Sequence, residues 1–108
     1  MALREGLADG TIDVIATDHA PHPEEAKECE WDAAAFGMIG LETALAISSR
    51  AMVDSGLMSF TELIARMSSK PAEIAGYTDH IKPLEVGRLA SLMAVSYTHL
   101  TLPTNREV

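Results

Sequence analysis

Residues 9–22, DGTIDVIATDHAPH, decide the fold class of this chain. Residues 11–17 form a short apolar run rich in β-branched side chains, bounded by Gly10 on one side and by Asp18 and His19 on the other. Such a run predicts a buried strand. A polar loop follows it, at the place where α/β proteins commonly keep their chemistry.

Helices are predicted on either side of this strand. Residues 2–9 read as the end of a helix that stops near Gly10, and residues 41–54 carry apolar side chains at helical spacing. A helix over 60–68 has the most complete start signal, which combines a capping box with a hydrophobic staple (Ser59 with Glu62, and Met58 with Leu63). Pro71 and Gly76 mark the two ends of another short helix, and residues 87–95 predict a second strand. The element order indicates an α/β fold.

Two loops separate the first strand from the 41–54 helix. Residues 18–30 are polar, and Pro21 and Pro23 resist a helix through that point. Residues 31–40 are more apolar, and on spacing alone Gly37 and Gly40 are packing or turn glycines. Phe36 is interpreted as a core or loop-anchoring aromatic residue and not as a stacking platform.

Size and charge exclude several classes of protein. The chain has 108 residues and a formal net charge of -8, which disfavours binding to nucleic acid or to anionic membranes. No apolar stretch reaches the roughly 20 residues that cross a bilayer, so we expect a cytoplasmic protein. A complete (β/α)8 barrel needs about 250 residues, so a barrel enzyme would be represented here by a fragment.

Asp18, His19 and His22 are the candidates for chemistry. A carboxylate after a strand binds a divalent metal or accepts a proton, and an imidazole binds metal or moves a proton. The simpler alternative is that Asp18 caps a turn and that both histidines are solvated. A site that also uses Cys29 has neither the zinc-finger nor the metalloprotease spacing.

The segment DGTIDVIATDHAPH closely resembles the last barrel strand of dihydroorotases, which are metal-dependent cyclic amidohydrolases. FGMIGLET at 36–43 resembles the loop and helix start that come next in these enzymes. KPAEIAG at 70–76 and VGRLAS at 86–91 resemble the family's later helix and its return into a small β domain, with Ser91 where an Asp is usual. The resemblance covers roughly residues 2–95.

The resemblance implies specific site residues. Asp18 matches the family's aspartate that binds zinc and acts as general base and acid. His22 matches the histidine that holds the substrate carboxylate. Phe36 and Gly37 match backbone positions that hydrogen-bond the pyrimidine ring.

The resemblance also implies the architecture. Residues 1–85 would be the C-terminal part of a (β/α)8 TIM-type metallohydrolase barrel, containing its last strand and closing helices, and 86–95 would start the small β domain. Residues 96–108 are expected to be a non-native tail, because SYTHLTLPTN at 96–105 resembles translated sequencing-adapter read-through. The family's His-X-His pair, metal-bridging residue and other ligands lie upstream of these motifs. We therefore expect the isolated chain to be inactive.

The implied function is zinc-dependent interconversion of N-carbamoyl-L-aspartate and L-dihydroorotate in pyrimidine biosynthesis. One alternative is another cyclic amidohydrolase, such as allantoinase or dihydropyrimidinase. Another is a non-catalytic dihydroorotase-like scaffold subunit for aspartate transcarbamoylase. The expected partner is a small-molecule substrate. For the full-length protein, the resemblance also leaves open a homo-oligomer or a complex with aspartate transcarbamoylase.

Overall fold

Helices make up the regular secondary structure of the computed structural model, which describes residues 2–77, 79, 84–88, 90, 92 and 93. None of the described helices is long and apolar enough to cross a membrane. In chain order the elements are α1 (Ala2–Asp9), α2 (Glu24–Lys27), α3 (Ala44–Ser48), the π-helical turn η1 (Ser49–Val53), α4 (Phe60–Met67) and α5 (Ser69–Ile74).

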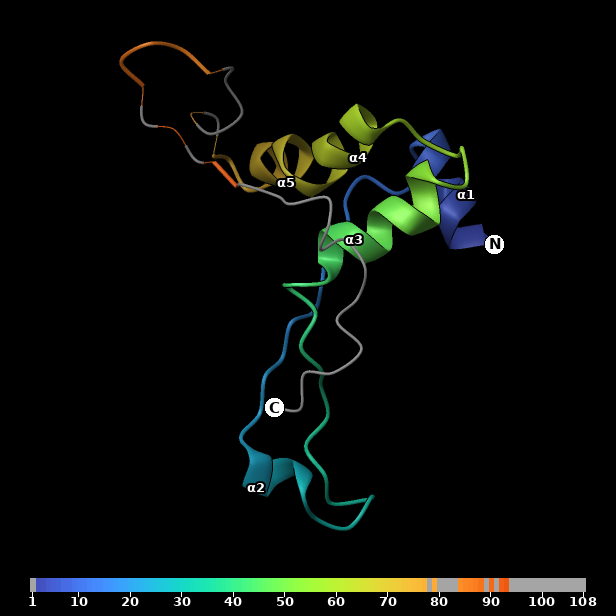
Figure 1. Ribbon diagram of the computed structural model, residues 1–108, viewed down its shortest axis with the longest axis vertical. Helices are drawn as coiled ribbons and strands as arrows, with labels where there is room; N and C mark the ends of the chain where they lie inside the picture. Colours follow the sequence, from blue (N-terminus) through green and yellow to red (C-terminus); the bar gives the residue numbers. More distant parts are fainter. Residues whose placement is uncertain (1, 78, 80–83, 89, 91, 94–108) are drawn as a thin grey trace.

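The chain divides into a helical cluster and an extended arm (Figure 1). α1, α3, η1, α4 and α5 gather at one end. Residues 17–43, which we name the arm, leave this cluster, reach α2 at the far end and return to α3. All of the residues that carry the predicted site therefore lie in the arm.

The core lies in the helical cluster. Its buried side chains come from α1, η1, α4 and the turn before α4, and they are Leu7, Met52, Met58 and Leu63. Leu63 is completely buried. In the arm, by contrast, the side chains of Trp31 and Phe36 are 96% and 99% exposed. The predicted role of Phe36 as an apolar anchor is therefore wrong for this structure.

Helix α4 begins as predicted. The Glu62 backbone N–H donates to Ser59 Oγ at 3.2 Å, and the Ser59 backbone N–H donates to the Glu62 carboxylate at 2.8 Å. The Ser59 hydroxyl also donates to this carboxylate, at 2.6 Å. These bonds favour the ionised form and lower the pKa of Glu62, with the side-chain bond from Ser59 as the largest cause. Met58 and Leu63, the predicted staple pair, are both buried in the core.

The predicted strand over 11–17 is absent, since these residues adopt no regular structure. Ile12 N–H donates to Gly6 O at 2.8 Å in α1, and Ile15 N–H donates to Arg66 O at 3.2 Å in α4. Both isoleucines pack against the helical core. A strand needs a neighbouring strand to accept its amides, and here the amides are satisfied by helices instead.

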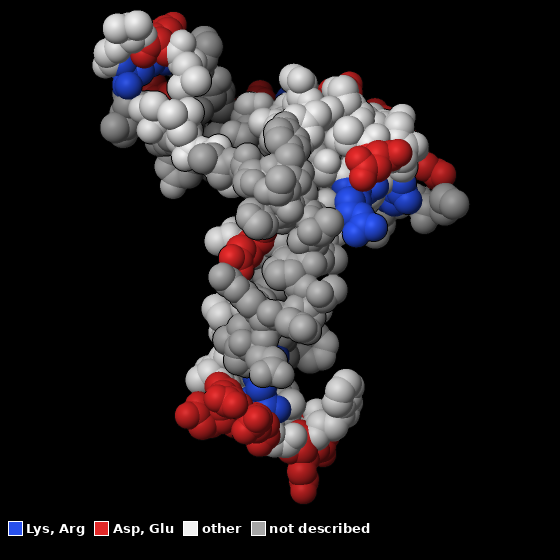
Figure 2. Space-filling view, viewed as in Figure 1, with Lys and Arg blue, Asp and Glu red and all other residues white. Residues whose placement is uncertain are grey.

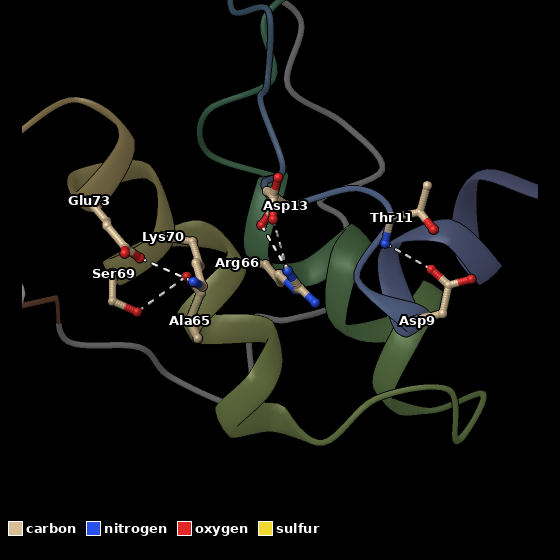
Figure 3. Close-up of polar contacts among 8 residues, drawn as sticks. All are labelled: Asp9, Thr11, Asp13, Ala65, Arg66, Ser69, Lys70 and Glu73. Atoms are coloured by element: carbon tan, nitrogen blue, oxygen red, sulfur yellow. Dashed lines mark hydrogen bonds and ion pairs between the residues drawn. The ribbon is translucent and has the colours of Figure 1, made fainter.

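Side-chain contacts reinforce this attachment (Figure 3). Arg66 donates to Asp13 O at 3.3 Å, and its guanidinium lies 3.9 Å from the Asp13 carboxylate. The Thr11 backbone N–H donates to Asp9 Oδ1 at 2.8 Å, and this bond is the main reason that the pKa of Asp9 is lowered. The segment that leads to Asp18 is thus held on α1 and α4.

The helix predicted over 41–54 begins three residues later, at Ala44, and continues through η1 to Val53. The Leu41 N–H donates to a histidine ring of the arm, so this residue is held in a turn. The predicted stop at Gly56 is confirmed by its φ of +72°.

The remaining sequence predictions need smaller corrections. The polar loop over 18–30 contains a short helix, α2, that starts directly after Pro23. Helix α5 begins at Ser69, two residues before Pro71. A proline fits there because the first four amides of a helix have no intrahelical partner. Of the predicted strand 87–95, residues 87, 88, 90, 92 and 93 are described and none is in a strand. The others, and the tail 96–108, lie outside the described residues.

Candidate functional site

Asp18 stands at the start of the arm with an exposed side chain and a φ of +47°. Positive φ is uncommon for a residue with a Cβ, although Asp and Asn tolerate it best, and such strain clusters at functional sites. No hydrogen bond of the Asp18 carboxylate occurs within the described part of the chain. The hydrogen bond to a backbone N–H that the turn-capping alternative requires is therefore not found there. The carboxylate remains available to a ligand or a proton.

His19 ties the two sides of the arm together. Its Nδ1 accepts hydrogen bonds from the backbone N–H groups of Gly40 at 3.0 Å and Leu41 at 3.2 Å. A parallel bridge joins His19 and Met38, and the Ala20 N–H donates to Met38 O at 2.9 Å. Because Nδ1 is an acceptor, the ring proton of neutral His19 is on Nε2. His19 is exposed, but its ring is held by the two backbone donors, which the simpler alternative of a solvated loop residue did not include.

His22 and Phe36 are brought together from opposite sides of the arm. The Nε2 atom of His22 lies 2.8 Å from the carbonyl oxygen of Phe36, and Nε2–H donates in this pair. The other ring nitrogen, Nδ1, then carries a proton only when the imidazole is charged. His22 can donate a second hydrogen bond, for example to a carboxylate, in that charged form.

Lys27 is a functional candidate that the sequence did not single out. Its ammonium donates to the carbonyl oxygen of Ala35 at 2.7 Å and also to the carbonyl oxygen of Gly37. The sequence shows Lys27 only as one cation among Glu24, Glu25 and Glu28, which favours a solvated face. The one feature of the sequence that could have indicated a role for Lys27 is its position, five residues after His22 on the same side of the arm.

Consecutive carbonyl oxygens in the segment 35–37 are thus taken up by Lys27 and His22. By contrast, no hydrogen bond from the backbone N–H of Phe36 or of Gly37 occurs among the residues that the structure describes. In a trans peptide the C=O and the N–H point in opposite directions. Two adjacent amide donors are therefore left for a ligand that presents acceptor oxygens.

Gly37 is required by the close packing of the arm. Its φ is +135°, and a Cβ at this position would lie 2.7 Å from Ala20 Cβ and 2.9 Å from Ala20 O. A Cβ on Gly40 would approach Thr17 O at 3.2 Å, a tighter contact than usual. The interpretation of these residues as packing glycines is consistent with this geometry.

Acidic side chains gather around α2 at the far end of the arm (Figure 2). They include the exposed residues Glu24, Glu25, Glu28 and Glu30. This end of the arm is unsuited to a polyanionic partner such as nucleic acid, which agrees with the chain's net charge of -8.

The described residues do not by themselves make a metal site. No group of three or more His, Cys, Asp or Glu side chains that could hold a metal is found within them. Cys29 is exposed and its thiol contacts only Ala26 O, at 3.6 Å, so a site built from Asp18, His19, His22 and Cys29 is not formed. Asp18 supplies one carboxylate, and a metal there needs further ligands from elsewhere.

Comparison with known proteins agrees with the sequence motifs. The profile described as the amidohydrolase family matches residues 1–107. The dihydroorotase of Streptomyces coelicolor is 58% identical over 95 residues, which are 88% of this chain and 22% of that protein. The dihydroorotase of Leifsonia xyli subsp. xyli is 55% identical over 91 residues, which are 84% of this chain and 21% of that protein. The dihydroorotase of Mycobacterium tuberculosis is 50% identical over 95 residues, or 88% of this chain and 22% of that protein.

The chain spans about a fifth of the length of these curated relatives. The family match, however, extends over nearly all of its own residues. The predicted resemblance is confirmed: this chain belongs to the amidohydrolase family, and with it to the TIM-barrel superfamily.

Proposed function

We propose that this chain is the C-terminal part of a zinc-dependent dihydroorotase that acts in the cytoplasm. The reaction is the reversible ring closure of N-carbamoyl-L-aspartate to L-dihydroorotate in pyrimidine biosynthesis. The observation that carries the proposal is the 58% identity to a dihydroorotase over 88% of this chain. The structure adds support, because the two motifs of the resemblance, 9–22 and 36–43, meet in the arm through His19 and His22.

In this proposal Asp18 is the catalytic residue. Its exposed carboxylate takes a proton from the water that attacks the ring amide of dihydroorotate, and returns it to the nitrogen that leaves. Ring closure runs through the same proton transfers in reverse. The strained backbone at Asp18 is consistent with such a role.

The substrate is held by residues from both sides of the arm. The backbone N–H groups of Phe36 and Gly37 donate to oxygens of the pyrimidine ring. His22 donates from Nδ1 to the substrate carboxylate, and this requires the charged imidazole because Nε2 is engaged with Phe36 O.

Zinc is the proposed metal, and it lowers the pKa of bound water and polarises a carbonyl when it is bound. Of the ligands it needs, the described residues offer Asp18 but no group of three, so the others must come from outside them. For this reason we expect the 108-residue chain alone to show no turnover.

The full-length protein tests the proposal directly. Ring closure of N-carbamoyl-L-aspartate is measured with zinc supplied, and bound zinc is quantified by elemental analysis. Asp18→Ala and Asp18→Asn should each reduce kcat by at least about 100-fold, which is the usual contribution of a general base. Activity of Asp18→Ala equal to that of the wild type refutes the role of Asp18.

The same measurement separates the alternatives. A full-length protein without turnover and without bound zinc would be the scaffold subunit, and co-purification with aspartate transcarbamoylase would then be examined. Turnover of allantoin or dihydropyrimidines in place of dihydroorotate would indicate another cyclic amidohydrolase. The relatives reported above are each named dihydroorotase, so these alternatives are not favoured.

The domain division is also a proposal. Residues 1–85 belong to the barrel, 86–95 begin a small β domain and 96–108 are a non-native tail. Long-read sequencing of the source DNA tests the last part. A source that independently encodes residues 96–108 refutes it.

A further inference from the structure

Lys27 joins the turn of α2 to the returning side of the arm. Its ammonium donates to Ala35 O at 2.7 Å and to Gly37 O, the carbonyls on either side of Phe36. Lys27 is eight residues from Ala35 and ten from Gly37, so these contacts are decided by the path of the arm and not by local helix geometry.

These bonds fix the orientation of one peptide group that the site uses. The Ala35 carbonyl belongs to the same planar trans peptide as the Phe36 N–H, so a carbonyl held toward Lys27 directs that N–H away from Lys27. His22 acts in the same way on the next peptide, because it holds Phe36 O and thereby orients the Gly37 N–H. Lys27 and His22 thus orient the two adjacent donors as a pair.

The arm does not depend on Lys27 to stay closed. The Ala35 N–H donates to Ala26 O at 2.8 Å, and this backbone bond joins the same two segments next to Lys27. His19 and Ala20 hold the arm closer to the helical cluster. Removal of the ammonium therefore frees the Ala35–Phe36 peptide to rotate without opening the arm.

We propose that Lys27 is a positioning residue that aims the Phe36 N–H at an acceptor oxygen of the bound cyclic amide. The inference rests on the proposed function, since it concerns the same substrate-binding segment. A residue with this role affects the binding of substrate more than the chemical step, so its loss raises KM and leaves kcat nearly unchanged.

The test compares Lys27→Met, Lys27→Arg and Glu25→Gln in the full-length protein. Methionine keeps the side chain up to the atom that bears the ammonium but donates no hydrogen bond, whereas arginine restores a charged donor. Glu25 lies in the same turn and is exposed, so its amide variant controls for charge changes around α2. Kinetics with N-carbamoyl-L-aspartate and a ligand-free crystal structure of Lys27→Met are the two readouts.

We expect Lys27→Met to raise KM by about 10- to 100-fold, the effect of losing a charge-assisted hydrogen bond, with kcat within about threefold of the wild type. Lys27→Arg should recover part of the loss, and Glu25→Gln should behave as the wild type. The crystal structure should show a rotated Ala35–Phe36 peptide. A KM for Lys27→Met within about twofold of the wild type overturns the proposal.

The crystal structure keeps the two proposals distinguishable. If the wild-type protein does not turn over N-carbamoyl-L-aspartate, the proposed function fails. A rotated Ala35–Phe36 peptide in Lys27→Met then still supports the positioning role for another ligand. An unchanged peptide overturns the positioning role whatever the activity is.

Discussion

Replacement of Gly37 by alanine tests the packing of the arm at its most crowded point. The added Cβ would lie 2.7 Å from Ala20 Cβ and 2.9 Å from Ala20 O, on a backbone with a φ of +135°. Carbon atoms that are not bonded pack best at about 3.5–4.0 Å. The two segments must therefore separate by roughly 0.8 Å or the backbone of Gly37 must change its conformation.

Either response disturbs the proposed site. The Ala20 N–H donates to Met38 O at 2.9 Å, and a separation of about 0.8 Å would break this bond. Overpacking typically costs about 1–3 kcal/mol, and backbone strain adds about as much, so a combined effect of about 2–6 kcal/mol is expected. If this free-energy cost is expressed as weaker substrate binding, KM rises by roughly 30-fold or more.

The assay uses full-length protein and measures both KM and the free energy of unfolding. Gly56→Ala is the matched control, because Gly56 has a φ of +72° but nothing lies within 4 Å of its added Cβ. This control should lose about 1 kcal/mol of stability from the backbone alone, with KM unchanged. The double variant Gly37→Ala with Ala20→Gly removes one of the two close contacts and should recover part of the loss.

Two results would refute the reasoning. If Gly37→Ala has the same KM and the same free energy of unfolding as Gly56→Ala, the close approach to Ala20 does not constrain the arm. If Ala20→Gly recovers nothing, crowding against the Ala20 side chain does not contribute to the loss.

Three further predictions concern the helical cluster. Since the pKa of Glu62 is lowered in the folded state, its ionised form stabilises α4 above about pH 4.3, and this stabilisation is lost as the pH falls through the lowered value. In thermal melting, the difference in Tm between the wild type and Glu62→Gln should therefore shrink in acid. A difference in Tm that is constant with pH contradicts this prediction. In urea titrations, Arg66→Ala should destabilise the protein by about 1.5 kcal/mol and Asp13→Asn by less than about 0.5 kcal/mol. The reason is that the backbone carbonyl of Asp13 is the closer partner of Arg66, whereas the Asp13 carboxylate is largely exposed. Equal losses of stability in the two variants would show that the ion pair dominates. Leu63→Ala should lose about 2–5 kcal/mol by urea unfolding, since Leu63 is completely buried, and a loss below about 1 kcal/mol would show that the cavity collapses.

Local patterns predicted the helices well because their signals act over a few residues. Ser59 and Glu62 lie within one turn and satisfy each other's backbone donors whatever the rest of the chain does. The ends of α1 and η1 near Gly10 and Gly56 follow from the same local preferences. Such elements are readable from sequence alone.

Strand prediction failed for residues 11–17 because a strand is defined by its neighbours. Ile12 and Ile15 have the side chains of a buried strand, but their amides donate to Gly6 O and Arg66 O. The sequence reports that this segment is apolar and β-branched, and it does not report which acceptors lie beside it.

The candidate site shows the same division. The motifs named Asp18, His22, Phe36 and Gly37, and their roles stay predictions. The sequence by itself determined the family, through two motifs in the right order, and the helix boundaries that depend on neighbouring residues. Only the tertiary structure decided that His22 holds Phe36 O, that His19 accepts from Gly40, and that Lys27 donates to Ala35 O. The physical reason is that these hydrogen bonds join residues 8 to 21 positions apart, and their formation depends on the path of the whole arm.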